Sequence, residues 1–394
     1  MTNYLELEDR YQSGVYAKRP ITIVRGAGAH LWDDAGKEYI DCVGGQGSAN
    51  MGHANEAVAA AISAQARILI TANEIFHNDK RAQLLAKLVS IAPPGLDRVY
   101  LSNSGAEAIE AALKLARWTT GRTQIIAFMR GFHGRTMGAL SATYEPKYRE
   151  PFLPLVPDFM HVPFDNLAKA DAAITAKTAG VIVEIVQGES GVRPASAEFL
   201  QGLQRLCRER GAMLIIDEVQ TGFGRTGKIF ACEHYNLEPD FLAVAKSIAG
   251  GLPMGATLLG PRVRKLDPML HGTTFGGSPL VCAAALAAIG YMQDHHLAER
   301  AAENGAYALG RLQRIESPLI REVRGLGLML GVELKQKVTP YLQALMDHGV
   351  LALPAGPNVL RLLPPLVIER SDLDIVADRI EAVLNEHVPA AAGE

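Results

Sequence analysis

The stretch GAMLIIDEVQTGFGRTGKIFACEHYNLEPDFLAVAKSIAGGLPMGA, residues 211–256, decides the fold of this chain. It holds two short apolar runs, each of the length of a buried strand in a parallel sheet. The first run, Ala212–Ile216, ends at Asp217, and the second, Phe241–Ala245, ends at Lys246. In an open α/β sheet, ligands bind beyond the carboxyl ends of the strands. A carboxylate and an amine are therefore expected at one site, where burial is unfavourable for both charges unless they are paired.

One cofactor chemistry needs such a pair. A lysine in a dry pocket can lose its proton and attack an aldehyde, which forms a Schiff base. If the aldehyde is pyridoxal phosphate (PLP), an aspartate usually keeps the ring nitrogen protonated so that the ring can withdraw electrons. We interpret Lys246 as the Schiff-base lysine and Asp217 as the partner of the ring nitrogen. Either residue taken alone is more commonly a solvated side chain at a strand end, so the rest of the chain has to support this interpretation.

The central stretch resembles the signature of the class III aminotransferases, PLP enzymes of fold type I, and the resemblance extends over nearly the entire chain. It departs at Ala249, where the family more often has a third glycine. The resemblance implies an α/β fold with a mostly parallel seven-stranded sheet in a large domain, plus a smaller α+β domain. We expect residues 1–50 to join the small domain, residues 51–278 to form the PLP-binding domain, and residues 279–394 to form the small domain.

The composition argues against several other classes of function. Hydrophobic residues make up 48% of the 394 residues and charged residues 21%, as in a soluble globular enzyme. The net charge of −3 provides no general basic field for nucleic acid or an anionic membrane. No signal peptide or membrane span is expected, and the tail Pro389–Glu394 is expected to fray. Four scattered cysteines indicate a reduced cytoplasmic protein without a metal or disulfide framework: Cys42, Cys207, Cys232 and Cys282.

A candidate phosphate site precedes the central stretch. Arg98–Leu101 predicts a strand, and a turn of small residues leads from it into a helix that begins near residue 105. Free amide groups at a helix start attract phosphate, although many such turns bind nothing, and this one lacks the P-loop ending. The resemblance implies that Gly105 and Ala106 contact the PLP phosphate.

The next apolar run, Gln124–Phe128, leads to Phe132 and Arg135. An aromatic ring at a strand end can stack on a flat cofactor, and the resemblance assigns Phe132 to the PLP ring. It also assigns Arg135 to a carboxylate of the substrate, for which a guanidinium fork is well suited. We interpret His133 as a hydrogen-bonding residue behind the site.

The resemblance assigns four more residues around the cofactor. Val219 is expected on the ring face opposite Phe132, and Gln220 beside the phenolic oxygen of the ring. Glu189 matches the gating glutamate of the family, despite the substitutions Ile185 and Ser190 in its loop. Arg361 lies in an otherwise apolar strand and needs a partner. Glu189, or the α-carboxylate of glutamate, is that partner in the family.

The block around residues 271–279 implies a shared active site. In the family this segment crosses a dimer interface, and its second hydroxyl residue binds the PLP phosphate of the neighbouring subunit. We carry this role to Thr274 and give Thr273 a role on the substrate side. Each active site then needs two chains, which predicts a homodimer.

The expected reaction is a ping-pong amino transfer with glutamate and 2-oxoglutarate as one pair of substrates. The overall pattern is close to N-acetylornithine aminotransferases. Two segments, Ser13–Gly26 and Val350–Glu369, look more like the branch that acts on lysine or ornithine attached to an amino-group carrier protein. We favour the carrier branch in lysine and arginine biosynthesis, and N-acetylornithine is the alternative. Because such a carrier is typically acidic, basic residues are candidates for docking, although scattered basic residues are usually just solvated: Lys18, Arg19, Arg25, Lys147 and Arg149.

Two other classes of function stay open. An aminomutase of the glutamate-semialdehyde type would keep Lys246 and Asp217 but would need no external keto acid, and the pair of Glu189 and Arg361 argues against it. A PLP-fold binding protein without catalysis would be expected to lose the lysine, which this chain retains.

Overall fold

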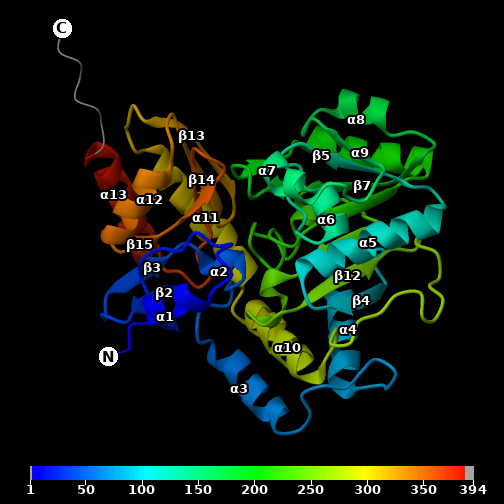
Figure 1. The fold of residues 1–394 in the computed structure, drawn as a ribbon, viewed down its shortest axis with the longest axis horizontal. Coiled ribbons are helices and arrows are strands. Elements are labelled where there is room, and N and C mark those ends of the chain that lie inside the picture. Colours follow the sequence, from blue (N-terminus) through cyan, green and yellow to red (C-terminus); the bar gives the residue numbers. More distant parts are fainter. Residues whose placement is uncertain (1, 387–394) are drawn as a thin grey trace.

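A seven-stranded sheet runs through one half of the molecule in the computed structural model, which describes residues 2–386 (Figure 1). The strand order is β4-β12-β11-β10-β7-β5-β6. Every neighbouring pair is parallel except the two that β12 forms with β11 and β4. The predicted α/β fold with a mostly parallel seven-stranded sheet is therefore confirmed. The strands are β4 (Arg98–Ser102), β5 (Gln124–Phe128), β6 (Phe159–Val162), β7 (Thr178–Glu184), β10 (Met213–Asp217), β11 (Phe241–Val244) and β12 (Gly255–Leu259).

The two central strands have the buried character that their apolar runs predict. Every residue of β10 and β11 is buried, because helices cover both faces of the sheet (Figure 1). Strand β12 was not predicted, and its first residue, Gly255, follows a segment that contains Gly250 and Gly251. This strand pairs in register from Gly255 opposite Ser102 to Leu259 opposite Arg98.

Side-chain caps mark the starts of several helices in this half. Asn55 accepts a hydrogen bond from the amide of Val58, and Ser104 accepts one from the amide of Glu107, where a helix was predicted to begin near residue 105. The helical elements are α3 (Glu56–Ala66), α4 (Asp79–Ile91), α5 (Gly105–Thr120), α6 (Met137–Ala142), α7 (Pro146–Arg149), η1 (Glu150–Phe152), α8 (Leu167–Ala173), α9 (Ala197–Arg210), η2 (Ala231–Tyr235), η3 (Lys246–Ala249) and α10 (Pro279–Asp294).

The other half combines the two ends of the chain. The strands β1 (Ile23–Ala27), β2 (His30–Asp33) and β3 (Glu38–Asp41) form a sheet with β15 (Val350–Leu351), and β15 runs parallel to β3. This pairing places the N-terminal strands beside a C-terminal strand, while the division into domains at residues 50 and 278 stays a prediction. The other elements are β13 (Ile320–Leu326), β14 (Met329–Leu334), β16 (Leu353–Ala355), β17 (Val359–Leu362), α11 (Leu297–Gln313), α12 (Thr339–Asp347) and α13 (Arg370–Glu386), with β8 (Val186–Gln187) and β9 (Arg193–Pro194) as a separate short pair.

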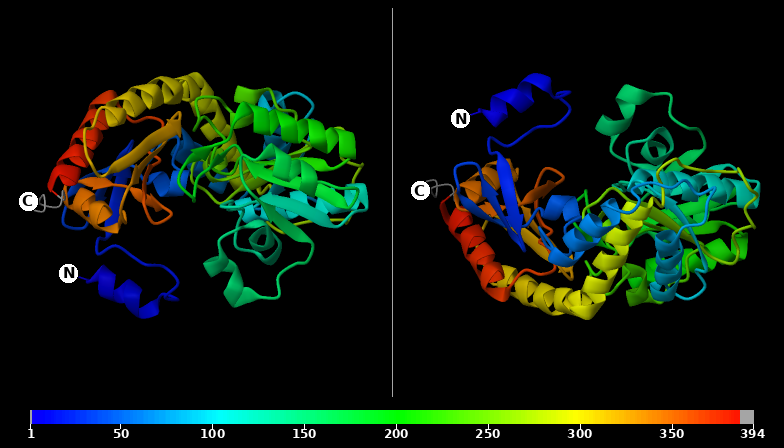
Figure 2. Two further views of the ribbon diagram at one scale, coloured as in Figure 1. Left: turned by 90° about the horizontal axis from the view of Figure 1, so that it is seen from above. Right: turned by 90° about the horizontal axis from the view of Figure 1, so that it is seen from below.

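Two N-terminal features were not predicted. Helix α1 (Tyr4–Tyr11) buries none of its residues, and it projects from the same side of the molecule as the α7 segment (Figure 2). The short element α2 (Gly44–Gly47) consists of four consecutive residues with positive φ. Within residues 2–386, no helix is both long and apolar enough to cross a membrane. The tail Pro389–Glu394 lies outside the described residues.

Candidate active site

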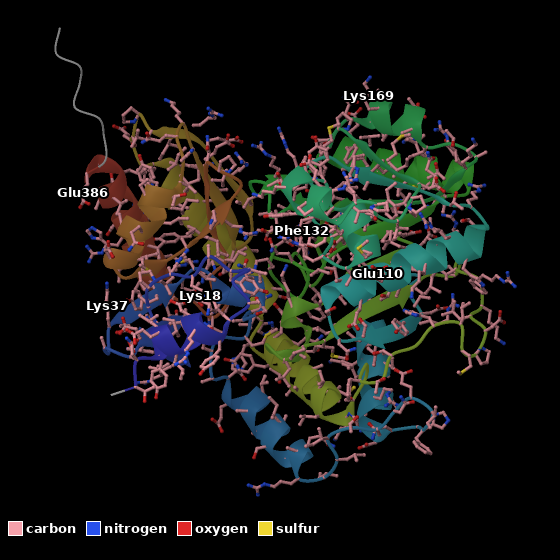
Figure 3. All side chains as sticks on the ribbon, in the orientation of Figure 1. Lys18, Lys37, Glu110, Phe132, Lys169 and Glu386 are labelled. Atoms are coloured by element: carbon pink, nitrogen blue, oxygen red, sulfur yellow. The ribbon has the colours of Figure 1, made fainter. Side chains whose placement is uncertain are left out.

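A cavity of about 410 Å³ lies beyond the carboxyl ends of β10 and β11, where the predicted carboxylate and amine follow the strands. Phe132 contributes to its wall and lies near the boundary between the two halves of the molecule (Figure 3). The volume falls within the range of small-ligand sites. Eight of the predicted site residues line it: Gly105, Ala106, Phe132, Glu189, Asp217, Val219, Gln220 and Lys246.

Asp217 belongs to a buried group of three ionisable side chains. Its Oδ2 lies 2.7 Å from Nδ1 of His133, and its Oδ1 accepts the amide hydrogen of Val219 at 3.0 Å. Burial alone would lower the pKa of His133, but the hydrogen bond and the charge of Asp217 raise it above its usual value. The imidazole thus holds the Asp217 carboxyl in place in the cavity wall, where it can face a protonated ring nitrogen.

Glu184 is the third member, and the sequence analysis did not single it out. It is the last residue of β7, lines the cavity and accepts the amide hydrogen of Phe132 at 3.0 Å. Burial raises its pKa to about 7, against the nearby charge of His133. The carboxylate thus fixes the backbone of the predicted ring-stacking residue. Its position at a strand end was the only sequence signal that could have found it.

Lys246 begins η3, and a single residue separates it from the end of β11. Its φ of +49° is rare for a residue with a side chain, and such strain is concentrated at functional sites. Removal from water lowers its pKa, an effect that the charges of Glu189 and Asp217 partly offset. The backbone after it is held because Ser247 donates a hydrogen bond to the carbonyl of Gly47 at 3.0 Å. A lysine with a lowered pKa is a better nucleophile and base at neutral pH.

The first turn of α5 faces the same cavity. The first amide groups of a helix have no partner within it, and the helix dipole adds a partial positive charge. Ser104 and Glu107 cap the turn, and the Glu107 carboxylate accepts the amide hydrogen of Asn103 at 2.7 Å. Gly105 packs closely, because an added Cβ would lie 2.8 Å from Cγ1 of Val219. Asn103 and Ser104 also line the cavity, and the sequence analysis did not include them among the site residues.

The predicted partner of Arg361 is in place. The Nη1 of Arg361 lies 2.7 Å from Oε1 of Glu189 and 3.4 Å from Oε1 of Gln220. The Nη2 of Arg361 lies 3.3 Å from Oε1 of Gln46. The arginine is buried, and its Nε has no hydrogen-bond partner among residues 2–386. Burial alone would raise the pKa of Glu189, but the charge and hydrogen bond of Arg361 lower it below its usual value. This geometry is a closed ion pair with an unused donor on the arginine.

Four predicted site residues do not line this cavity: Arg361, described above, and three others. Arg135 is exposed and stacks on the ring of Tyr148, with Cζ 3.5 Å from the ring centroid. Thr273 accepts a hydrogen bond from Nδ2 of Asn103 at 2.9 Å on the far side of the phosphate turn. Thr274 is exposed. The role of Thr274 at the site of a neighbouring subunit stays a prediction.

Comparison with known proteins identifies the family. The model of the class III aminotransferases matches residues 11–384. The chain is 52% identical to a "[LysW]-aminoadipate semialdehyde transaminase" of Deinococcus radiodurans, over 98% of this chain and 91% of that protein. It is 45% identical to an acetylornithine aminotransferase of Methanopyrus kandleri, over 94% and 95% of the two chains.

Solved structures of aminotransferases have the same fold as this chain. The ornithine aminotransferase of Toxoplasma gondii superimposes with a TM-score of 0.93 at 34% identity, covers 97% and 93% of the two chains, and holds PLP at partial occupancy. The acetylornithine aminotransferase of Elizabethkingia anophelis gives a TM-score of 0.87 at 34% identity, over 97% and 98%. This chain belongs to the class III aminotransferases, and it is an aminotransferase that uses PLP.

The residues present fit that cofactor. The cavity offers a helix start for a phosphate, a buried carboxylate for a ring nitrogen and a lysine with a lowered pKa for an aldehyde. A side chain at position 105 would collide with Val219, so this position of the turn requires glycine. The predicted stacking of Phe132 and Val219 on opposite ring faces stays a prediction.

Proposed function

We propose that this enzyme moves the terminal amine of an α-N-blocked lysine or ornithine, attached to an amino-group carrier protein, to 2-oxoglutarate. The donor leaves as an aldehyde, and the acceptor becomes glutamate. The observation that carries the proposal is the closed pair of Arg361 and Glu189 beside Lys246. The names of two relatives, from Deinococcus radiodurans and Pyrococcus horikoshii, support the carrier-bound donor.

The side chains divide the work. When bound, PLP supplies an aldehyde that takes up the amino group and a ring that withdraws electrons. The Nζ of Lys246 removes the proton from the amine-bearing carbon of the donor. In the second half-reaction it delivers a proton to the α-carbon of 2-oxoglutarate. Asp217, supported by His133 at 2.7 Å, holds a negative charge at the base of the cavity. The amides of Gly105 and Ala106 bind the phosphate.

The pair of Arg361 and Glu189 lets one site accept two substrates. The terminal carbon of the donor carries no carboxylate, and the closed pair neutralises the guanidinium in that half-reaction. Glutamate brings an α-carboxylate that competes with Glu189 for Arg361, and the unused Nε adds a donor for it. Arg135 binds the distal carboxylate of glutamate, and the α-carboxylate of the blocked donor in the other half-reaction.

N-acetylornithine is the second candidate donor. Relatives named acetylornithine aminotransferase, such as the protein of Methanopyrus kandleri, favour it. In both donors the blocked α-amine prevents cyclisation of the aldehyde product. An aminomutase of the glutamate-semialdehyde type is a weaker candidate, since it would not need an arginine switch for an external keto acid.

We further propose a homodimer with shared active sites. Arg81 ties two segments together, because Nε donates to the carbonyl of Gly277 at 2.9 Å and Nη1 to that of Phe76 at 2.8 Å. The two segments, residues 68–76 and 269–277, both expose large apolar side chains, which a second copy of the chain would cover. The most exposed are Ile68, Ile75, Phe76, Met269 and Phe275.

In that dimer Thr274 binds the phosphate at the site of the other subunit, and Thr273 lies on the substrate side. Mixing inactive Lys246→Ala and Thr274→Glu chains tests this, because one site of the mixed dimer then regains both native residues. Recovery of activity supports the shared site, and no recovery despite mixed dimers contradicts it. A cytoplasmic location is also proposed, supported by four cysteines that are buried and free.

The decisive experiment compares two donors in single turnover. The purified PLP enzyme is mixed with carrier-bound lysine or with N-acetylornithine, and loss of the cofactor absorbance is followed. Faster reaction of the carrier-bound donor supports the proposal. Equal or faster reaction of N-acetylornithine would assign the enzyme to the second candidate.

A further inference from the structure

A second cavity adjoins the first and has no role in the amine transfer described above. Its volume is about 530 Å³, and Phe132 and Glu189 line both cavities, so the two spaces share a wall. Beyond that wall, Lys147 and Tyr148 of the α7 segment line one side. The turn at residues 354–357, between β16 and β17, lines the other side. The second cavity is therefore built by both halves of the molecule.

Arg135 lines neither cavity itself, but it contacts the rings of Phe132, which lines both, and Tyr148, which lines the second, and so it lies beside their junction. Its Cζ is 3.5 Å from the ring centroid of Tyr148 and 5.5 Å from that of Phe132. A guanidinium stacked on aromatic rings keeps its N–H edge available for a carboxylate. With its α-carboxylate on Arg135 and its terminal amine at Lys246, a donor would span the first cavity and present its α-carbon at this junction.

The group that blocks the α-amine must then continue outward from the junction. We propose that the second cavity is the channel for the amide-linked arm that tethers the donor to its carrier protein, with Tyr148 as its wall and Lys147 as a binding residue. The inference rests on the proposed function and names the part of the site that reads the tether. An acetyl group ends at the junction, whereas an arm of two or more residues, at about 3.5 Å each, needs an open path to the surface.

The charges along the channel fit a peptide-like arm. Lys147 supplies an ammonium, while Glu145 and Glu189 supply carboxylates. An arm of peptide units carries N–H donors as well as carbonyl and carboxylate acceptors, so it can pair with both signs. A small inorganic anion would meet two carboxylates and one ammonium, which disfavours it.

Three of the other four basic residues considered for docking already contact other groups of the chain. Lys18 forms an ion pair with Glu8 at 2.6 Å, and Arg19 donates to the carbonyl of Ala352. Arg25 stacks on Trp32 with Cζ 4.4 Å from the ring centroid. Lys147 has its Nζ 4.9 Å from the ring centroid of Tyr148, and of the five candidates it is the one that lines the channel, so the test uses this residue.

The test uses two variants of residues that line the channel. Lys147→Glu reverses the charge of one wall, and Pro357→Trp places a large side chain in the channel from the opposite wall. Lys169→Glu on α8 is the matched control, because it makes the same charge change on an exposed residue far from Phe132 (Figure 3). For each PLP-loaded enzyme, kcat/KM is measured with carrier-bound lysine and with N-acetylornithine. The affinity for carrier-bound lysine is also measured by calorimetry in the Lys246→Ala background, which binds without turnover.

Both channel variants should lower kcat/KM for carrier-bound lysine roughly tenfold, mainly through KM, and weaken its binding to a similar extent. The loss of kcat/KM with N-acetylornithine should be at least about threefold smaller. Lys169→Glu should leave kcat/KM unchanged for both donors. An equal loss with both donors, or no loss with carrier-bound lysine, would overturn the channel. If wild-type enzyme neither binds nor converts carrier-bound lysine, the proposed function fails first, and that result precedes any variant.

Discussion

Replacing Glu189 with glutamine tests the two-substrate switch most directly. The substitution keeps the size and one hydrogen-bond acceptor of the side chain but removes its charge from the 2.7 Å contact with Arg361. The pair should then close less tightly. The half-reaction with glutamate, which needs Arg361 free, should gain relative to the half-reaction with the blocked amine donor.

The size of the effect follows from the contact. At 2.7 Å and an effective dielectric constant of about 20, Coulomb's law gives about 6 kcal/mol. The Glu189 side chain is 35% exposed, so solvent screens much of this energy, and about 2 kcal/mol is a reasonable net value. A change of about 2 kcal/mol corresponds to roughly 30-fold in the ratio of the two half-reaction rates.

The assay is single-turnover kinetics with each amine donor separately, followed by the absorbance of the bound cofactor. Arg361→Gln and the double variant complete a double-mutant cycle, which isolates the coupling between the two side chains. In the Arg361→Gln background, the Glu189 substitution should shift the ratio by less than about threefold. If Glu189→Gln left the ratio unchanged, or slowed both half-reactions equally, the switch would be wrong.

Three further outcomes are expected from other parts of the site. Asp217→Asn removes the charge that faces His133 at 2.7 Å and should slow both half-reactions roughly a hundredfold or more, with a lower pKa of His133 measurable by NMR. Burial raises the pKa of Glu218 to about 7, so the folded chain binds this proton more tightly than the unfolded chain, and stability falls as the pH rises from about 4.5 through 7. Thermal unfolding at pH 5 and pH 8 should therefore show Glu218→Gln gaining on wild type at the higher pH, by up to about 3 kcal/mol, and an unchanged difference would contradict the buried charge. In Gly188→Ala the new Cβ would lie 1.8 Å from Oε1 of Gln220, which should displace that side chain and reduce kcat/KM roughly tenfold with little change in melting temperature, whereas wild-type kinetics would mean that Gln220 has no part in the site.

Much of the fold could be predicted because its signals are local. The apolar runs that end at Asp217 and Lys246 became the neighbouring strands β10 and β11, and Gln124–Phe128 became β5 with those bounds. The helix starts capped by Asn55 and Ser104 were also visible in the sequence. Strand β12 was not predicted, because the segment before it contains Gly250 and Gly251 and has turn composition, and only the pairing of β12 between β11 and β4 makes it a strand.

The candidate site divides in the same way. The sequence by itself determined that an aspartate and a lysine stand at the ends of two buried strands, and that a helix start follows a third strand, because strand ends and helix starts have short-range signals. Only the tertiary structure brought Glu184 to the His133–Asp217 pair, set Gln46 against Arg361 and opened the second cavity beside Tyr148. These contacts join residues far apart in the chain, such as Arg361 and Gln46 at a separation of 315 residues. No local pattern specifies such a distance, since it results from how the two halves of the molecule pack against each other.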